Sequence, residues 1–235
     1  MTAASTQYAS FIRHQFGEFR PVWLPTTLVS PGDILSLNSD GTFQRLGSLS
    51  SNEATKHVPL VSREGTAPFQ MNFVSSSGCS VATKASGETS VQLPEVPQAS
   101  AGFAISFERT GALVISATDA SEAYIENLLE VESNLRDLFQ QKQWDAGLIV
   151  AAKVVQAGTF TLFLSESDHS KVEVSLSGTL TPAIPEIGKV GVGIDVINSA
   201  GSVLTIGPLK TVTPFVIGVR LVPIFPDAHR VFHVV

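Results

Sequence analysis

The sequence predicts an α+β protein built mostly from a twisted, antiparallel β-sheet, with a short N-terminal helix and one longer amphipathic helix near the middle of the chain. Three observations lead to this fold class. Apolar and polar residues alternate over many short segments, as they do in half-buried strands. Turn-forming Gly, Pro, Asn and Asp separate these segments. The helical spacing of apolar residues is confined to two segments.

The composition favours a water-soluble, cytoplasmic protein that binds no nucleic acid. Of the 235 residues, 43% are hydrophobic and 15% are charged, and the net charge is −6 without a cluster of Lys and Arg. The single cysteine, Cys79, fits a reducing compartment, and residues 1–15 lack the pattern of a secretory signal. The longest apolar run, 147–155, is far shorter than the roughly 20 residues of a membrane-spanning helix. We expect one β-rich domain over residues 1–235, with 94–101 as the candidate boundary if there are two.

The first helix is predicted from apolar residues that share one helical face and precede Gly17, a residue that favours a helix end. These residues are Tyr8, Phe11, Ile12 and Phe16. Three prolines keep residues 19–31 extended or irregular. Residues 34–37 and 42–46 then form a hairpin around the turn 38–41.

The segment from residue 48 to residue 101 has a weaker pattern. Its candidate strands are 68–74, 81–84 and 89–93. A half-buried strand follows at 103–107, and a turn at Thr110-Gly111 leads to a second strand at 112–116.

The longer helix is predicted over residues 119–143. Asp119 and Glu122 have the spacing of a capping box. Apolar residues form one stripe: Ile125, Leu128, Leu129, Leu135, Leu138 and Phe139. The opposite face is acidic. Its residues Glu126, Glu130 and Asp137 are the candidate surface for a protein partner, and a solvated helix face is the alternative interpretation.

Antiparallel strands are predicted throughout the rest of the chain. Their ranges are 148–156, 160–164, 172–176, 190–196, 202–206 and 215–224.

No constellation of catalytic residues is visible, and we expect neither enzymatic activity nor a bound cofactor or metal. His229 and His233 share one face of a strand, but a third metal ligand is not evident. Cys79 lies in a polar segment without an adjacent base, so we interpret it as an ordinary thiol. The glycines of 188–193 alternate with other residues, which is typical of a strand and not of a phosphate-binding loop.

The order of features resembles the pore-forming gasdermin family in its compact bacterial form. Five strings carry the resemblance: 19–22 (FRPV), 43–49 (FQRLGSL), 149–155 (IVAAKVV), 202–207 (SVLTIG) and 214–221 (PFVIGVRL). The resemblance implies a gasdermin-like fold and a dormant soluble monomer. After an activating protease cuts it, such a protein inserts amphipathic hairpins into membrane lipid and assembles with its own copies into a ring. The implied role is membrane pore formation in bacterial antiviral defence and cell death.

The candidate membrane-inserting hairpin consists of two alternating segments, 159–164 and 171–176, joined by a turn at 165–170. Its apolar residues are Phe160, Leu162, Leu164, Val172, Val174 and Leu176. Residues 103–107 and 112–116 fit the same form. A half-buried hairpin in a β-sandwich has the same alternation, so that interpretation stays open.

Two features depart from the bacterial gasdermin pattern. Those proteins carry a lipidated cysteine close to the N-terminus, and residues 1–19 contain none. Only residues 226–235 follow the last predicted strand, which leaves little length for an inhibitory tail. A relative that forms no pore therefore remains an alternative. So does a soluble, non-enzymatic protein–protein interaction module with no membrane step.

Overall fold

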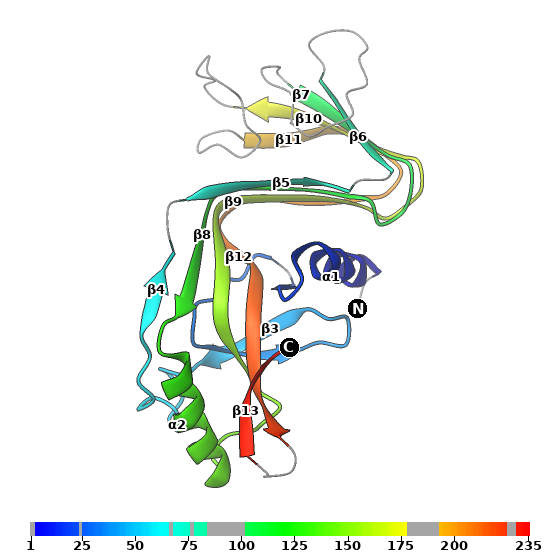
Figure 1. Ribbon diagram of the computed structural model, residues 1–235. Coiled ribbons are helices and arrows are strands. Elements are labelled where there is room, and N and C mark those ends of the chain that lie inside the picture. Colours follow the sequence, from blue (N-terminus) through cyan, green and yellow to red (C-terminus); the bar gives the residue numbers. More distant parts are fainter. Residues whose placement is uncertain are drawn as a thin grey trace.

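The computed structural model describes residues 3–23, 25–65, 68–75, 78–83, 102–177, 193–224 and 229–235. This part of the chain contains helices α1 (Ala3–Phe16) and α2 (Leu128–Gln140) and two antiparallel β-sheets. The small sheet lies over one end of the large sheet, and α1 lies against the opposite face of the large sheet (Figure 1). The fold class is therefore α+β with antiparallel sheet predominating, as the sequence predicts.

The large sheet has nine strands arranged around β9 (Ile149–Ser165). Strand β9 pairs with β2 (Asp33–Leu37), β8 (Leu113–Ile125) and β12 (Val203–Ile224). The outer strands are β1 (Arg20–Pro21), β3 (Phe43–Ser48), β4 (Ser62–Glu64), β5 (Phe69–Val74) and β13 (His229–Val234).

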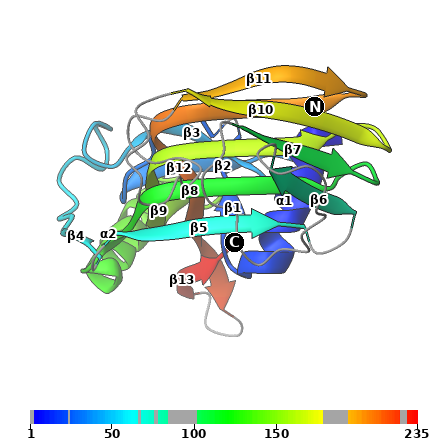
Figure 2. The ribbon, with the colours of Figure 1, turned by 90° about the horizontal axis from the view of Figure 1, so that it is seen from above.

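The small sheet has four strands in the order β11–β10–β7–β6. They are β6 (Cys79–Thr83), β7 (Gly102–Phe107), β10 (Ser170–Ser177) and β11 (Gly193–Ala200). Each follows or precedes a strand of the large sheet: β5 leads to β6, β7 to β8, β9 to β10, and β11 to β12. Figure 2 shows the strands of both sheets running along nearly the same direction. The chain therefore forms two long hairpins that fold back over the large sheet at a common corner (Figure 1).

A bend crosses the large sheet at three adjacent residues. Asp119 in β8 and Thr211 in β12 have left-handed φ values of 50° and 53°, which is uncommon for residues other than glycine. The strand registers place both opposite Gly158 of β9. Left-handed residues interrupt strand pairing and bend a sheet, and β8, β9 and β12 all curve in Figure 1.

Two apolar clusters lie on opposite faces of the bent sheet. The first joins Tyr8 and Ile12 of α1 to β8, β9 and β12, where Phe160, Leu162 and Leu164 are fully buried. The second fills the space between the two sheets. Helix α2 packs its Val131 and Leu135 on a third cluster, which includes residues of β9 and β12.

The first helix and the hairpin of β2 and β3 form where the sequence predicts them. Tyr8 and Ile12 are buried, and Gly17 ends α1 with a left-handed φ of 62°. The turn between β2 and β3 closes with Gly41 at a φ of 85°. Predicted strands 68–74 and 81–84 correspond to β5 and β6. Segments 89–93 and 94–101 lie outside the described residues.

The helix predicted over 119–143 is wrong in its first part and is not the longer of the two. Residues up to Ile125 belong to β8, and α2 has 13 residues against 14 in α1. Glu122 does not cap a helix, because it pairs with Val155 of β9 and its carboxylate lies 2.7 Å from the Nζ of Lys153. Strand pairing outweighs the local capping pattern here. The backbone carbonyl oxygen of Asn127, the residue before α2, accepts the backbone N–H of Glu130 at 3.0 Å.

Two predicted hairpins are wrong in their pairing. Strand β7 pairs with β6 and β10, not with β8, and β9 pairs with β12 and β8, not with β10. The turns predicted at 110–111 and 165–170 are therefore the places where the chain passes from one sheet to the other. Other predicted strands merge: 148–156 with 160–164 in β9, and 202–206 with 215–224 in β12.

Candidate functional site

The predicted insertion residues lie in two different apolar clusters. Phe160, Leu162 and Leu164 of β9 are buried against the cluster of α1. Val172 and Val174 of β10 are buried between the sheets, in the second cluster. The backbone of Leu176 pairs with Ile194, and its side chain lies outside the described part. The structure thus places these residues on consecutive strands but does not bring the two sets together.

The small sheet has one apolar and one polar face. Its inner face, toward the large sheet, carries side chains that are at most 2% exposed: Val81, Ile105, Phe107, Val172 and Val174. The alternate residues are polar or small and are exposed or half-buried: Ser80, Ala82, Ala104, Ser106, Lys171 and Glu173. The strand registers align both sets in rows across β6, β7 and β10. This sheet is amphipathic in the sense that a membrane-spanning barrel wall requires.

Apolar residues have the same sequence parity on both sides of the corner. Between the corner and the bend at Gly158, the residues of β9 in the cluster of α1 are even-numbered, and so are Val172 and Val174 of β10, which face the large sheet. Beyond the bend the parity changes, and Val155 and Ala157 of β9 belong to the same cluster. In β7 and β8 both sets are odd-numbered: Ile105 and Phe107, then Leu113, Ile115 and Ala117. A continuous strand has a period of two. If the corner straightened, the two apolar sets would therefore lie on one face of each strand.

Every crossing of the corner contains a residue with left-handed backbone. These residues are Gly78 (φ 81°), Gly111 (φ 81°), His169 (φ 54°) and Gly201 (φ 76°). Left-handed φ lies outside the strand region, so each of them reverses the strand direction locally. The corner is a line of four such hinges.

Hydrogen bonds between neighbouring crossings hold the corner. The Asp168 Oδ1 accepts the backbone N–H of Thr110 at 2.7 Å and its hydroxyl at 2.8 Å. These two donors hold the pKa of the exposed Asp168 carboxyl below its usual value. The hydroxyl of Ser202 donates to Glu166 Oε2 at 2.9 Å, and its backbone N–H donates to Ser167 Oγ at 2.9 Å.

Cys79 belongs to the packing of the small sheet. It lies half-buried beside the cluster between the sheets, in register with Phe107. Burial raises the pKa of its thiol to about 12. A thiol in this state is a poor nucleophile.

The histidines and acidic groups form no metal site within the described ranges, where no three His, Cys, Asp or Glu side chains come together. His233 is exposed on β13, where its Nδ1 lies 2.6 Å from the Val234 carbonyl oxygen. Segment 188–192 lies outside the described residues.

The three acidic residues proposed as a partner surface do not form one helical face. Glu126 precedes α2 and pairs with Arg63 at 2.9 Å. Glu130 accepts a hydrogen bond from the Asn127 amide at 2.8 Å, whereas the Asp137 side chain is exposed. Leu129, in the first turn of α2, is 82% exposed.

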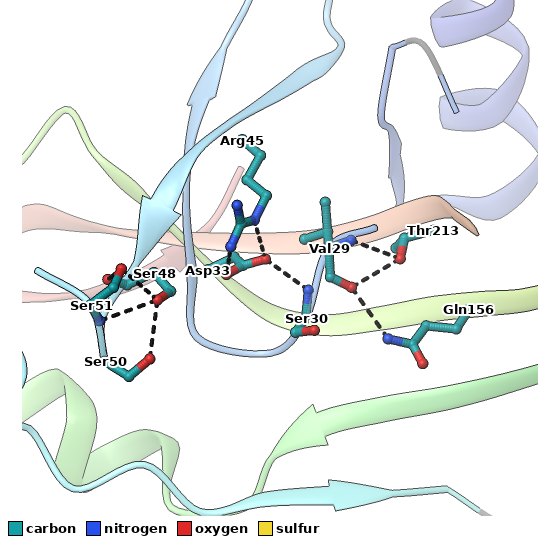
Figure 3. A network of polar contacts seen from close by, with 9 residues as sticks. All are labelled: Val29, Ser30, Asp33, Arg45, Ser48, Ser50, Ser51, Gln156 and Thr213. Atoms are coloured by element: carbon teal, nitrogen blue, oxygen red, sulfur yellow. Dashed lines mark hydrogen bonds and ion pairs between the residues drawn. The ribbon is translucent and has the colours of Figure 1, made fainter. Parts of the chain in front are cut away.

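Two polar networks fasten the large sheet on the side of the bend away from the corner (Figure 3). The buried Asp33 accepts two bonds from the Arg45 guanidinium, at 2.7 and 3.0 Å, and the Ser30 N–H at 2.9 Å. The bonds to Asp33 raise the pKa of Arg45. Thr213 Oγ1 accepts the N–H of Val29 and donates to its carbonyl oxygen, both at 2.9 Å. The sequence did not predict these contacts, because Val29 and Thr213 are 184 residues apart and because the pairing of β2 with β3 brings Arg45 to Asp33.

No protein-family model matches the chain, and neither does any curated protein. Among solved structures, the cryo-EM structure of the gasdermin A3 membrane pore is similar over all of this chain and 95% of that chain, with 12% sequence identity and a TM-score of 0.35. The protein there is the A3 gasdermin, and a relation to the bacterial members is not shown. The described part of the chain contains no helix long and apolar enough to span a bilayer.

Proposed function

We propose that this protein is a gasdermin-like, non-enzymatic pore former that self-associates and inserts its two folded hairpins into a lipid bilayer. The observation that carries the proposal is the amphipathic small sheet joined to the large sheet by four left-handed hinges. When the small sheet swings away, its apolar inner face meets lipid and its Ser, Lys and Glu face meets the water-filled lumen.

One of the two hairpins approaches the length of a membrane-spanning strand, whereas β6 and β7 of the other have 5 and 6 residues. Strands β10 and β11 each have 8 residues, and a tilted membrane-spanning strand needs about 9–11. The polar corner then lies at the level of the lipid headgroups, beyond the roughly 30 Å hydrocarbon core.

The strand order supports self-association edge to edge. Four chain segments cross the corner, and each consists of one strand of the large sheet and one of the small sheet. Their order across the molecule is β5–β6, β8–β7, β9–β10 and β12–β11, and each is antiparallel to the next. The first and last therefore run in opposite directions. Copies that stand side by side in one orientation join these edges into a continuous antiparallel wall, which leaves no strand edge unpaired in lipid.

The proposed cycle begins in the cytoplasm and ends at a membrane. A trigger, such as the activating protease that the sequence resemblance implies, releases the small sheet. A pore of this kind lets ions and solutes escape and kills the cell that holds it. That outcome corresponds to the cell-death and defence role that the resemblance implies. The role needs no catalytic residue, cofactor or metal.

Two measurements on lipid vesicles test the proposal. Dye release from vesicles of neutral and of anionic lipid reports whether the protein permeabilises a bilayer. Environment-sensitive fluorophores on single cysteines at 171, 172, 173 and 174, in a Cys79→Ala background, report which residues meet lipid. We expect blue-shifted emission at positions 172 and 174 and water-like emission at positions 171 and 173. Absence of dye release, together with uniform emission at all four positions, would contradict the proposal.

A further inference from the structure

In the middle of the corner, the chain segments β7–β8 and β9–β10 lie side by side and keep the same register in both sheets. In the large sheet Leu113 of β8 pairs with Leu164 of β9, and in the small sheet Phe107 of β7 pairs with Ser170 of β10. Residues 108–112 and 165–169 separate these pairs, so both strands contribute the same number of residues to the corner. The β7–β8 and β9–β10 strands can therefore close into one straight ladder without any slip.

The outer crossings do not share this property. The pairing of β6 with β7 and that of β5 with β8 differ in offset, because Cys79 opposes Phe107 whereas Val74 opposes Val114. In the sequence, four residues (75–78) separate these pairs on one strand and six residues (108–113) separate them on the other. A continuous register is thus specific to the central pair, where the two hairpins meet.

Within the straight ladder, the corner residues acquire definite partners. Counting inward from Phe107 and Ser170 places Glu108 opposite His169 and Arg109 opposite Asp168. Both pairs join a basic and an acidic side chain, and directly opposed charges of opposite sign stabilise an antiparallel pair. In the folded corner Asp168 is bound instead to Thr110, which belongs to the other hairpin.

We infer that the corner encodes a second, straight ladder in which Asp168 leaves Thr110 and pairs with Arg109, while Glu108 pairs with His169. This inference rests on the proposed function and names the open form of the same hinge. Arg109 and Asp168 share the parity of the apolar residues Phe107 and Val172, so they lie on the lipid-facing side. Pairing the two ions there lowers the cost of placing each charge at the border of the membrane.

Two features of the folded corner oppose the change to the straight ladder. The backbone N–H of Thr110 donates to the Asp168 carboxylate instead of to a strand carbonyl. The backbone of His169 is left-handed and must return to the strand region before Glu108 can face it. Straightening therefore exchanges one set of polar contacts for another. Burial of the apolar face in the membrane provides the free energy that favours the straight form.

Cysteine cross-linking tests the ladder. Residues directly opposite in an antiparallel pair have Cα atoms about 4.5–5.5 Å apart, which suits a disulfide. In the Cys79→Ala background, Arg109→Cys/Asp168→Cys is expected to cross-link at least about fivefold more on vesicles or in mild detergent micelles than in water. The off-register pair Arg109→Cys/Ser167→Cys is the control and should gain little.

Charge reversal tests the same pair by function. Arg109→Glu should slow dye release about tenfold, and the double variant Arg109→Glu/Asp168→Arg should restore at least half of the rate. Circular dichroism and gel filtration confirm that each variant is folded before it is assayed.

The outcomes separate the two proposals. If dye is released but cross-linking does not rise and the double variant does not recover, the ladder is wrong and the pore stands. If no preparation releases dye, the proposed function fails, and cross-linking in micelles still decides the ladder: an unchanged yield overturns it, and an increase restricted to the 109/168 pair supports it.

Discussion

Gly158 of β9 lies so close to Asp119 of β8 that a Cβ atom on the glycine would stand 2.8 Å from the Cβ of the aspartate. This contact lies at the bend of the large sheet, where Asp119 already has a left-handed backbone. The bend shapes the face against which α1 packs and separates the part of the sheet near α2 from the folded hairpins. Close packing of two backbones therefore sets the geometry from which the hairpins leave.

We predict that Gly158→Ala lowers the free energy of unfolding by about 1–3 kcal/mol, because the new methyl group overpacks the bend. Urea denaturation followed by tryptophan fluorescence measures the change. Gly47→Ala is the matched control, since no heavy atom lies within 4 Å of a Cβ there, and its effect should stay within about 0.5 kcal/mol. Equal destabilisation by both variants would show that the contact at the bend has no special role.

Thr213 is predicted to be the main polar fastening of the segment around Val29 to β12. Thr213→Val keeps the shape of the side chain but leaves the buried N–H and carbonyl of Val29 without its hydroxyl, which costs about 1–3 kcal/mol. Thr213→Ser retains the hydroxyl and loses only a methyl group, so it should cost less. The free energy of unfolding of both variants decides the matter, and a larger loss in the serine variant would contradict the assignment.

Local patterns in the sequence were sufficient for some elements and insufficient for others. The helix α1 and the hairpin of β2 and β3 depend on contacts between near neighbours, and both were predicted. The start of α2 was not, because Asp119 and Glu122 satisfy a capping pattern locally while β8 continues through them to pair with β9. Long-range strand pairing decided the structure there.

The sequence did not predict that the chain passes from one sheet to the other at the corner. Two strands separated by a short turn usually pair with each other, so 103–107 with 112–116 and 159–164 with 171–176 were interpreted as hairpins. The turn at 165–170 was predicted, but no residue in it indicates that the chain passes there to another sheet, with His169 in a left-handed conformation. The parity of the apolar residues was visible in the sequence, but its meaning needed the burial of each set.

The titration of Asp168 is predicted to report the closed corner. Hydrogen bonds from the N–H and hydroxyl of Thr110 lower the pKa of Asp168 from 3.8. For a depressed acid, the stabilisation is fully present above the ordinary pKa and is lost as the pH falls through the lower pKa of the folded state. The closed corner should therefore loosen only in acid below about pH 4.

The amide chemical shift of residue 110 across this range measures the midpoint. Thr110→Val removes the hydroxyl donor and keeps the N–H donor, so the midpoint should rise part of the way toward the ordinary value. Thr110→Ser keeps both donors and should leave it unchanged. A midpoint that is the same in all three proteins would mean that the Thr110 hydroxyl does not hold Asp168.

Cys79 is predicted to act as a natural reporter of the small sheet. Burial raises its pKa from 9.0 to about 12, so the thiolate fraction at pH 8 falls about a thousandfold and a water-soluble disulfide reagent should react slowly. Denaturant should restore the rate of a free thiol.

On vesicles the inner face meets lipid, so a membrane-soluble maleimide should label Cys79 faster than it does in water, whereas a charged maleimide should not. A Lys171→Cys, Cys79→Ala protein supplies the opposite case, because position 171 lies on the polar face and should favour the charged reagent throughout. If membrane binding leaves the labelling pattern of Cys79 unchanged, the small sheet has stayed folded over the large one.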